Sequence, residues 1–240
     1  MAAFFPDARP RCVRLAAAAL VCLLVRPAAG PAEARQSEGG GTIAGRVTAP
    51  DDDFFEGLRR GRKLLRYDMH AMPAEPIRPY RLSEVAAVYV ESAQGAGKEP
   101  PPGQNPSLNQ FQMVFRPLVL PVTAGTTVDF PNNDNLYHNV FSYSQPGQFD
   151  LGRYPKGKKR SVTFDEPGIV NVYCDIHSYM FATIIVLDNP YFALPDDDGA
   201  FSIAGVPEGT YDLTFWYGRK KIATKGVTVK DGKTSTVHFP

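Results

Sequence analysis

Cysteine and histidine are scarce in this chain. Three cysteines and four histidines occur among 240 residues. Cys12 and Cys22 lie near the N-terminus, so Cys174 is the one cysteine in the remaining nine-tenths of the sequence. If the N-terminal segment is removed, no internal disulfide can form, and any site that needs two cysteines is excluded. No two histidines lie within four residues of each other, which excludes the paired-histidine motif of zinc proteases.

Long hydrophobic runs are also missing. The longest apolar stretch, residues 15–25, follows Arg9, Arg11 and Arg14 and precedes small residues up to Ala34. This order is typical of a secretory signal peptide, which we assign to residues 1–34. The stretch is shorter than the roughly 20 residues that a membrane-spanning helix needs. Cys22 is not expected to be a lipoprotein cysteine, because larger residues precede it. We therefore expect a protein without a transmembrane segment, periplasmic or secreted.

An excess of charge of either sign is absent. Removal of residues 1–34 would take away four arginines, Asp7 and Glu33 and leave 22 basic and 23 acidic residues. A near-neutral chain gives no indication of nucleic acid or another polyanion as a partner. The sequence does not indicate an oligomeric state.

One short segment, residues 174–180, contains three metal-binding side chains. Cys174, His177 and Met180 offer a thiolate, an imidazole and a thioether at spacings of three residues, a set that suits copper. The alternating apolar residues before Cys174 predict a strand that turns the cysteine inward. A second apolar run, residues 181–187, follows at once. We therefore expect a hairpin whose connection holds the three donors.

A fourth ligand would come from one of the remaining histidines. His138 shares strand parity with Val140 and is expected to face the same interior, so we select it. His238 lies on a predicted C-terminal strand and is expected to be an ordinary strand residue. His70, between Met69 and Met72, offers a second copper site as an alternative, but the prolines that follow favour an irregular surface loop.

Residues 107–188 resemble the cupredoxins, the small blue-copper proteins. The similarity lies in residues 122–130, in Asn133-Asp134, in His138-Asn139-Val140 and in residues 174–180, with the Cys-x-x-His-x-x-Met spacing of amicyanin. Ile176 stands where amicyanin and plastocyanin usually have a proline. The resemblance implies an all-β Greek-key sandwich and one type 1 copper ion with His138, Cys174 and His177 as strong ligands and Met180 as the weak axial one.

The same resemblance implies two further details. The backbone N–H of Asn139 would hydrogen-bond the Cys174 sulfur. His177 would reach the surface inside an apolar patch and serve as the port for electrons, with Tyr179, Phe181 and Tyr137 around it. For Cys174 alone, the alternative is a buried structural thiol, the usual state of a free cysteine.

The flanking sequence predicts more strands. Candidates are residues 42–48, 85–90, 200–203, 210–217, 227–229 and 234–239, with turns at Asp198-Gly199, Glu208-Gly209 and Asp231-Gly232. The tail resembles carboxypeptidase regulatory-like (transthyretin-like) sandwiches in residues 198–201 and 206–211. We therefore expect a split second β-sandwich of residues 40–100 plus 189–240, with the cupredoxin domain, residues 103–188, inserted in it or packed beside it.

Two basic segments are candidate docking surfaces. Residues 54–72 combine apolar residues near helical spacing with Arg59, Arg60, Arg62, Lys63 and Arg66, and residues 156–160 contain four cations. Each is more simply a solvated segment, and docking of an acidic partner is the alternative for both. We predict a one-electron carrier that serves an unidentified redox partner protein. The alternative is a non-redox copper protein for storage, delivery or sensing. We predict that the protein is not an enzyme, because copper enzymes of this kind need further histidines.

Overall fold

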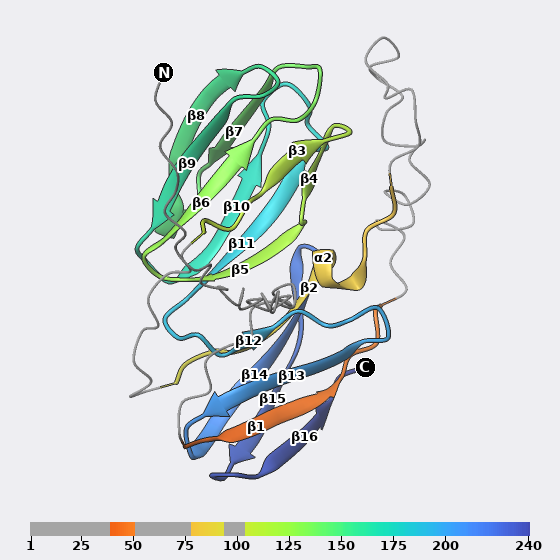
Figure 1. The fold of residues 1–240 in the computed structure, drawn as a ribbon, viewed down its shortest axis with the longest axis vertical. Coiled ribbons are helices and arrows are strands. Elements are labelled where there is room, and N and C mark those ends of the chain that lie inside the picture. Colours follow the sequence, from red (N-terminus) through yellow and green to blue (C-terminus); the bar gives the residue numbers. More distant parts are fainter. Residues whose placement is uncertain (1–38, 51–77, 94–103) are drawn as a thin grey trace, which may run out of the picture. The chain divides into compact units, whose positions relative to one another are not determined.

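The computed structural model describes residues 39–50, 78–93 and 104–240 (Figure 1). The predicted signal peptide (1–34), the basic segment 54–72, His70 and the proline-rich stretch 99–103 therefore lie outside the described residues. The described chain is nearly all β, as the sequence predicted, and belongs to one compact unit. We call residues 104–187 the central region and residues 39–50, 78–93 and 188–240 the flanking region.

The central region contains nine strands and one 3-10 turn among its described residues. They are β3 (Asn109–Phe111), β4 (Val114–Arg116), β5 (Val119–Thr123), β6 (Thr126–Pro131), β7 (His138–Ser142), η1 (Gln145–Gly147), β8 (Phe149–Tyr154), β9 (Lys159–Phe164), β10 (Gly168–Tyr173) and β11 (Phe181–Leu187). The main sheet has the order β5-β11-β10-β7-β8, and β6 pairs with β9 and β3 with β4. The predicted hairpin is confirmed, because β10 and β11 are antiparallel neighbours with Tyr173 opposite Phe181.

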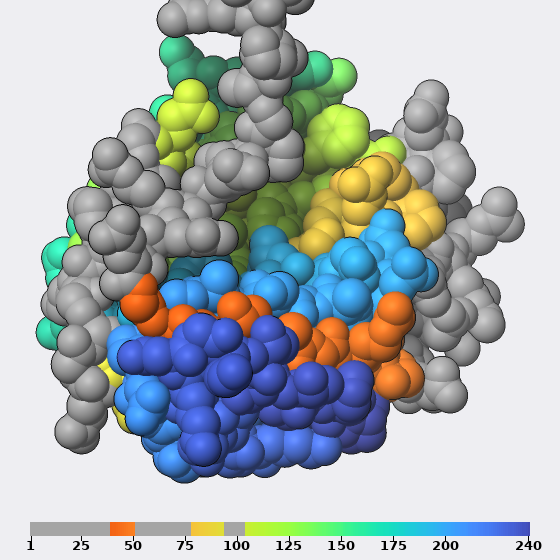
Figure 2. All heavy atoms as spheres, turned by 60° about the horizontal axis from the view of Figure 1, so that its bottom comes forward, coloured from red at the N-terminus to blue at the C-terminus, as the bar shows by residue number. Residues whose placement is uncertain are grey.

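The flanking region brings the two ends of the described chain together. Its elements are β1 (Gly41–Arg46), α2 (Leu82–Val85), β2 (Ala86–Val90), β12 (Phe192–Ala193), β13 (Ala200–Val206), β14 (Gly209–Tyr217), β15 (Lys220–Val229) and β16 (Thr234–His238). They form a sheet of order β13-β1-β16 and a sheet of order β12-β2-β14-β15. Figure 2 shows β1, in orange, running between the blue strands from the C-terminal part of the chain.

Close packing fixes β1 between its two neighbours. A side chain at Gly45 would meet the Val237 carbonyl oxygen of β16 at 1.6 Å, so only glycine fits there. Ile43, on the same strand, is completely buried in the apolar core that the two flanking sheets share. His238 ends β16 as an exposed residue, in agreement with its predicted role as a strand residue.

Each region has an apolar core, although Leu118 and Phe181 of the central region belong to the flanking one. The core of the central region includes Val140, Val172 and Cys174, whereas Phe215 and Ile43 belong to the core of the flanking sheets. A third cluster, which includes Trp216 of β14 and Ile185 of β11, joins the regions.

Candidate metal centre

His138 is the first residue of β7 and is completely buried. It has the same parity as Val140, which is also completely buried, so the strand carries both side chains into the core of the central region. The prediction that His138 faces the interior is therefore confirmed. Antiparallel pairing places β7 between β8 and β10, and Tyr173 at the end of β10 lies opposite Phe141. This register brings His138 to the end of the sheet at which Cys174 follows β10.

The loop between β10 and β11 carries the other predicted donors. Cys174 and His177 are 3% and 4% exposed, and Met180 is 1% exposed. The backbone N–H of Met180 donates to the His177 carbonyl oxygen at 2.9 Å, which closes a tight turn. Because strands hold both ends of this short loop, its donors have a defined direction. We call the end of the central region that contains His138 and residues 174–180 the site end.

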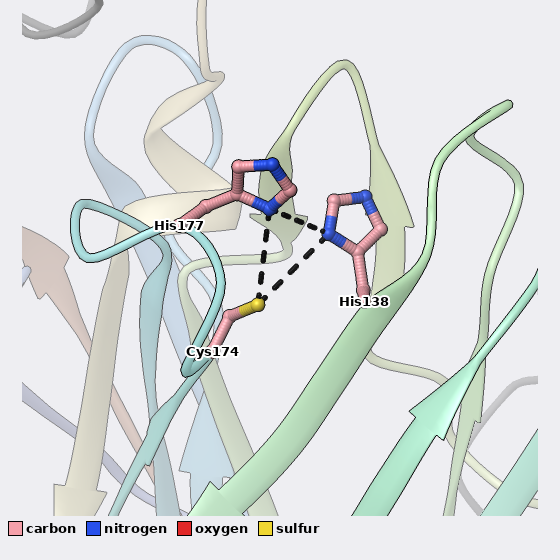
Figure 3. A group of neighbouring side chains, drawn as sticks. All are labelled: His138, Cys174 and His177. Atoms are coloured by element: carbon pink, nitrogen blue, oxygen red, sulfur yellow. Dashed lines mark hydrogen bonds between the residues drawn. The ribbon is translucent and has the colours of Figure 1, made fainter. Parts of the chain in front are cut away.

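Three donor atoms converge at the site end, as Figure 3 shows. The Nδ1 atoms of His138 and His177 are 3.0 Å apart, and the Cys174 Sγ lies 4.0 Å and 3.9 Å from them. Both imidazoles present their Nδ1 atoms to a common centre, although they come from segments 39 residues apart. Two buried nitrogen lone pairs at this separation need a shared proton or a cation between them. The borderline nitrogens and the soft sulfur fit a copper ion.

Met180 is the fourth predicted ligand. Its side chain belongs to the same buried cluster as Cys174 and Val140. A buried thioether in the cluster of the thiolate is suited to a weak, soft interaction with copper.

The surroundings of Cys174 lower the pKa of its thiol. Burial raises the pKa of the Cys174 thiol, but hydrogen bonds from His138 and His177 and from the backbone N–H groups of Asn139 and His177 outweigh burial and lower the pKa to about 6. The sequence analysis expected the Asn139 backbone N–H to hydrogen-bond this sulfur, and its effect on the Cys174 pKa agrees with that expectation. Asn139 also joins the two ligand segments through its side chain, whose Oδ1 accepts from the Asp175 N–H at 3.3 Å. A thiolate is the form that binds metal.

Asp134 orients the His138 ring. Its Oδ2 lies 2.8 Å from the His138 Nε2, so the carboxylate holds a proton on Nε2 and directs the Nδ1 atom at Cys174. Burial raises the pKa of Asp134, but the hydrogen bonds from His138 and from the Met113 and Gln112 N–H groups outweigh it and hold the pKa below its usual value. Burial likewise lowers the pKa of His138, and the contacts with Asp134 and Cys174 reverse this and raise it.

The same carboxylate supports an unusual turn between β3 and β4. Gln112 and Met113 have positive φ angles of 55° and 59°, a conformation that hairpin turns usually assign to asparagine and glycine. The Asp134 Oδ1 accepts from the Gln112 N–H at 2.6 Å and Oδ2 from the Met113 N–H at 2.8 Å. Sequence analysis included Asp134 in the resemblance but missed its role, because nothing in Gln-Met identifies a turn that needs external acceptors.

This turn packs against the aromatic neighbour of His177. Met113 and Val114 form a buried cluster against which Tyr80, Leu136 and Tyr179 pack, and the Tyr179 ring centroid lies 6.0 Å from that of His177. We call this cluster the cap. The expectation that His177 reaches the surface is therefore wrong, since its side chain is 4% exposed. The sequence analysis did not predict the β3–β4 hairpin, whose Met113 and Val114 pack against Tyr179 beside His177.

Tyr80, just before α2, forms contacts that hold the cap in place. The Tyr80 hydroxyl donates to the Phe115 carbonyl oxygen at 2.8 Å, and the Arg116 guanidinium lies 4.1 Å from the Tyr80 ring centroid. Arg116 also pairs with Glu84 at 3.2 Å. Buried, hydrogen-bonded ion pairs fix geometry more than they stabilise a fold, so this network holds the hairpin in one position.

Comparison with known proteins agrees with the site. Residues 105–187 match the family of copper binding proteins, plastocyanin/azurin family. Residues 105–187 are therefore similar to the cupredoxins. This match covers the segments on which the resemblance was based, including both ligand segments, and it confirms that part of the sequence analysis.

Several solved structures are similar to part of the chain. A copper-containing nitrite reductase (NirK) from Thermus scotoductus SA-01 is 26% identical over 40% of this chain, with a TM-score of 0.34. This chain covers 25% of that reductase. A purple cupredoxin from Nitrosopumilus maritimus is 28% identical over 30% of this chain and 81% of its own (TM-score 0.28). A point mutant of amicyanin in its Cu(I) form is 23% identical over 41% of this chain and 97% of its own (TM-score 0.33).

The tail matches a different family from the one expected. Residues 188–237 match polysaccharide lyase family 4, domain II, rather than a carboxypeptidase regulatory-like domain. The motifs behind the prediction, such as Asp198-Gly199 and Glu208-Gly209, specify turns between strands. Gly199 has a φ of 81°, which explains why glycine stands there, but such turns occur in many sandwiches and do not identify a family.

No helix among the described residues is long and apolar enough to cross a bilayer. The one α-helix assigned to them, α2, has four residues.

Proposed function

We propose that the protein is a type 1 copper protein that carries single electrons between redox partners outside the cytoplasm. His138, Cys174 and His177 would be the strong copper ligands and Met180 the weak axial one. The observation that carries this proposal is the convergence of two imidazole Nδ1 atoms and one thiol sulfur within 4.0 Å in a buried site. The match of residues 105–187 to the copper binding proteins supports the choice of metal.

The side chains of the site have defined tasks in this function. Copper, when bound, supplies a one-electron couple. Cys174 offers a thiolate near neutral pH, and Asp134 keeps the His138 Nδ1 directed at the centre. The apolar cluster around Cys174 and Met180 excludes water. A site that is rigid before metal binds resists the rearrangement that each change of oxidation state would otherwise cause.

We further propose two domains and an exported chain. Residues 103–188 would form the cupredoxin domain, and residues 40–100 plus 189–240 the second sandwich, after removal of the signal peptide at residues 1–34. The strand pairing supports the split, since β1 and β2 pair with strands that follow residue 189.

A non-redox role in copper storage, delivery or sensing is the second candidate. The observation that favours it is the burial of His177, because a carrier exchanges electrons faster when a ligand lies near the surface. Protein film voltammetry of the copper-loaded chain tests the two against each other. An electron carrier predicts fast, reversible one-electron waves. Slow exchange together with tight retention of Cu(I) would contradict the carrier function and favour delivery or storage.

A further inference from the structure

Because His177 is buried, electrons would have to reach the proposed copper site by another surface residue. The cap closes the side of the site at which His177 lies, through Tyr179 and the Met113 cluster. His138 itself is completely buried, and its outer nitrogen is engaged by Asp134. The residue before it, Tyr137, is 59% exposed. Tyr137 is therefore a large, exposed aromatic residue that directly precedes a proposed copper ligand in the chain.

A basic hairpin borders the loop that leads to His138 and contains Tyr137. The turn between β8 and β9 lies against the loop that leads to His138, because Gly157 N–H donates to the Asn132 carbonyl oxygen at 2.7 Å and Asn132 N–H to the Lys158 carbonyl oxygen at 2.9 Å. The Lys156 ammonium donates to Asn135 Oδ1 at 2.8 Å. These bonds place two exposed lysines beside the loop that contains Tyr137.

Carboxylates in the surrounding elements are already engaged. Asp129 pairs with Lys159 at 2.6 Å and Asp175 with Arg153 at 2.9 Å, and Asp134 receives three hydrogen bonds. Neither Lys156 nor Lys158 forms an ion pair with a carboxylate of the described residues. Lys156 and Lys158 therefore present exposed positive charge on this hairpin, although the whole chain has a formal net charge of only +1.

We propose that Tyr137, with Lys156 and Lys158 beside it, is the docking surface for a redox partner whose own docking surface is acidic. This inference rests on the proposed carrier function and names its partner surface. One electron leaves the reduced site on the His138 side and reduces a one-electron acceptor held at Tyr137, and no proton is transferred. Opposite charges on the two surfaces accelerate the encounter.

Charged small oxidants test the surface on the copper-loaded, ascorbate-reduced chain. Stopped-flow rates are measured with anionic hexacyanoferrate(III) and with cationic tris(1,10-phenanthroline)cobalt(III), at low and high salt. The charge-reversal variant is Lys156→Glu with Lys158→Glu. Its control, Lys230→Glu with Lys233→Glu, makes the same charge change at exposed residues beside the β15–β16 turn. A second pair compares Tyr137→Ala with Tyr143→Ala, since Tyr143 is 75% exposed just beyond the other end of β7.

The surface predicts opposite responses to the two oxidants. At low salt, Lys156→Glu with Lys158→Glu slows oxidation by hexacyanoferrate about tenfold and accelerates oxidation by the cobalt complex, and added salt removes both effects. The control pair does not change either rate. Tyr137→Ala slows both oxidants at unchanged absorption and reduction potential, and Tyr143→Ala does not.

Equal effects of the two charge variants, or of the two tyrosine variants, would overturn the docking surface while fast reversible voltammetry kept the carrier function intact. A wild-type chain without thiolate-to-copper absorption or reversible oxidation would overturn both.

Discussion

Buried polar side chains distinguish the two β regions. Among the described residues, buried polar side chains of the flanking region are Asn189 and Thr214. The central region buries a much larger group: Gln110, Arg116, Thr126, Asp129, Asn132, His138, Asn139, Ser142, His177 and Thr183. Burying a polar group is unfavourable unless hydrogen bonds replace water, so a fold retains many of them where their geometry is needed. The flanking region is built for packing, and the central region positions a site.

Truncation of a buried side chain in the flanking region tests this division of roles. It should have the largest effect on stability. Phe215 is completely buried, and its ring centroid lies 5.6 Å from that of Phe239. Phe215→Ala should lower the free energy of unfolding by about 3–5 kcal/mol. The visible spectrum of the copper-loaded folded protein should not change. Urea unfolding and absorption measure the two quantities, and an altered spectrum would show that the flanking region shapes the site.

The ionisation of Cys174 gives the central region a pH dependence of its own. The pKa of this thiol falls from its ordinary value near 9 to about 6 in the fold, so between these values the unfolded chain binds the extra proton. Stability from the thiolate is therefore present above pH 9 and is lost as the pH falls to 6. The raised pKa of His138 acts in the opposite sense, since its contribution is present at low pH and is lost as the pH rises through the folded value.

The difference between wild type and Cys174→Ser reports the ionisation of the thiol together with its effect on His138. Without metal, the stability of wild type relative to the variant should rise between pH 6 and 9, with a slope that approaches 1.4 kcal/mol per pH unit, an order-of-magnitude limit for one proton. Chemical unfolding at three pH values measures it. A difference that stays flat over this range would mean that the folded chain keeps as many protons as the unfolded one, on the sulfur or on His138.

Asp134 should affect the site more than the fold around it. Asp134→Asn keeps the size of the side chain but removes the charge and one acceptor for the β3–β4 turn. Loss of a group that orients a ligand histidine typically weakens metal binding by about 10–100-fold. Copper competition titrations measure this, with Asp165→Asn as a control that makes the same charge change at an exposed residue. Equal affinities for the two variants would remove Asp134 from the account of the site.

Met180 should have the smallest effect on stability. Met180→Leu keeps the volume, so the loss should stay within about 1.5 kcal/mol. Copper binding and the visible band should persist. The reduction potential should rise, because Cu(II) loses more from the missing thioether than Cu(I) does. Voltammetry measures this potential. An unchanged value would mean that Met180 contributes to packing and is not an axial ligand.

The sequence was sufficient for the elements with a local signal. The hairpin of β10 and β11, the inward direction of His138 and the ligand loop followed from alternation and spacing. Much of β15 was missed, because residues 220–226 are largely polar and exposed, and pairing with β14 rather than a buried face makes them a strand.

The cap could not be predicted from the sequence, because it also depends on contacts between distant segments. Its β3–β4 turn uses Gln112 and Met113 at positive φ, and the acceptors that satisfy it come from Asp134, more than 20 residues later. Long-range hydrogen bonds of this kind leave no periodic pattern. The burial of His177, beside the Tyr179 ring that packs on the cap, was the site property that the sequence analysis got wrong.

The visible absorption spectrum of the copper-loaded chain, compared with that of Cys174→Ser, tests the central claim most directly. Wild-type protein should show an intense thiolate-to-copper band, and copper at a thousandfold excess over its Kd should stabilise the fold by about 4 kcal/mol. Cys174→Ser should lose the band completely, because a hydroxyl group cannot replace the soft sulfur. A serine variant that kept the band, or a wild-type protein without it, would contradict the assignment of Cys174 as a copper ligand.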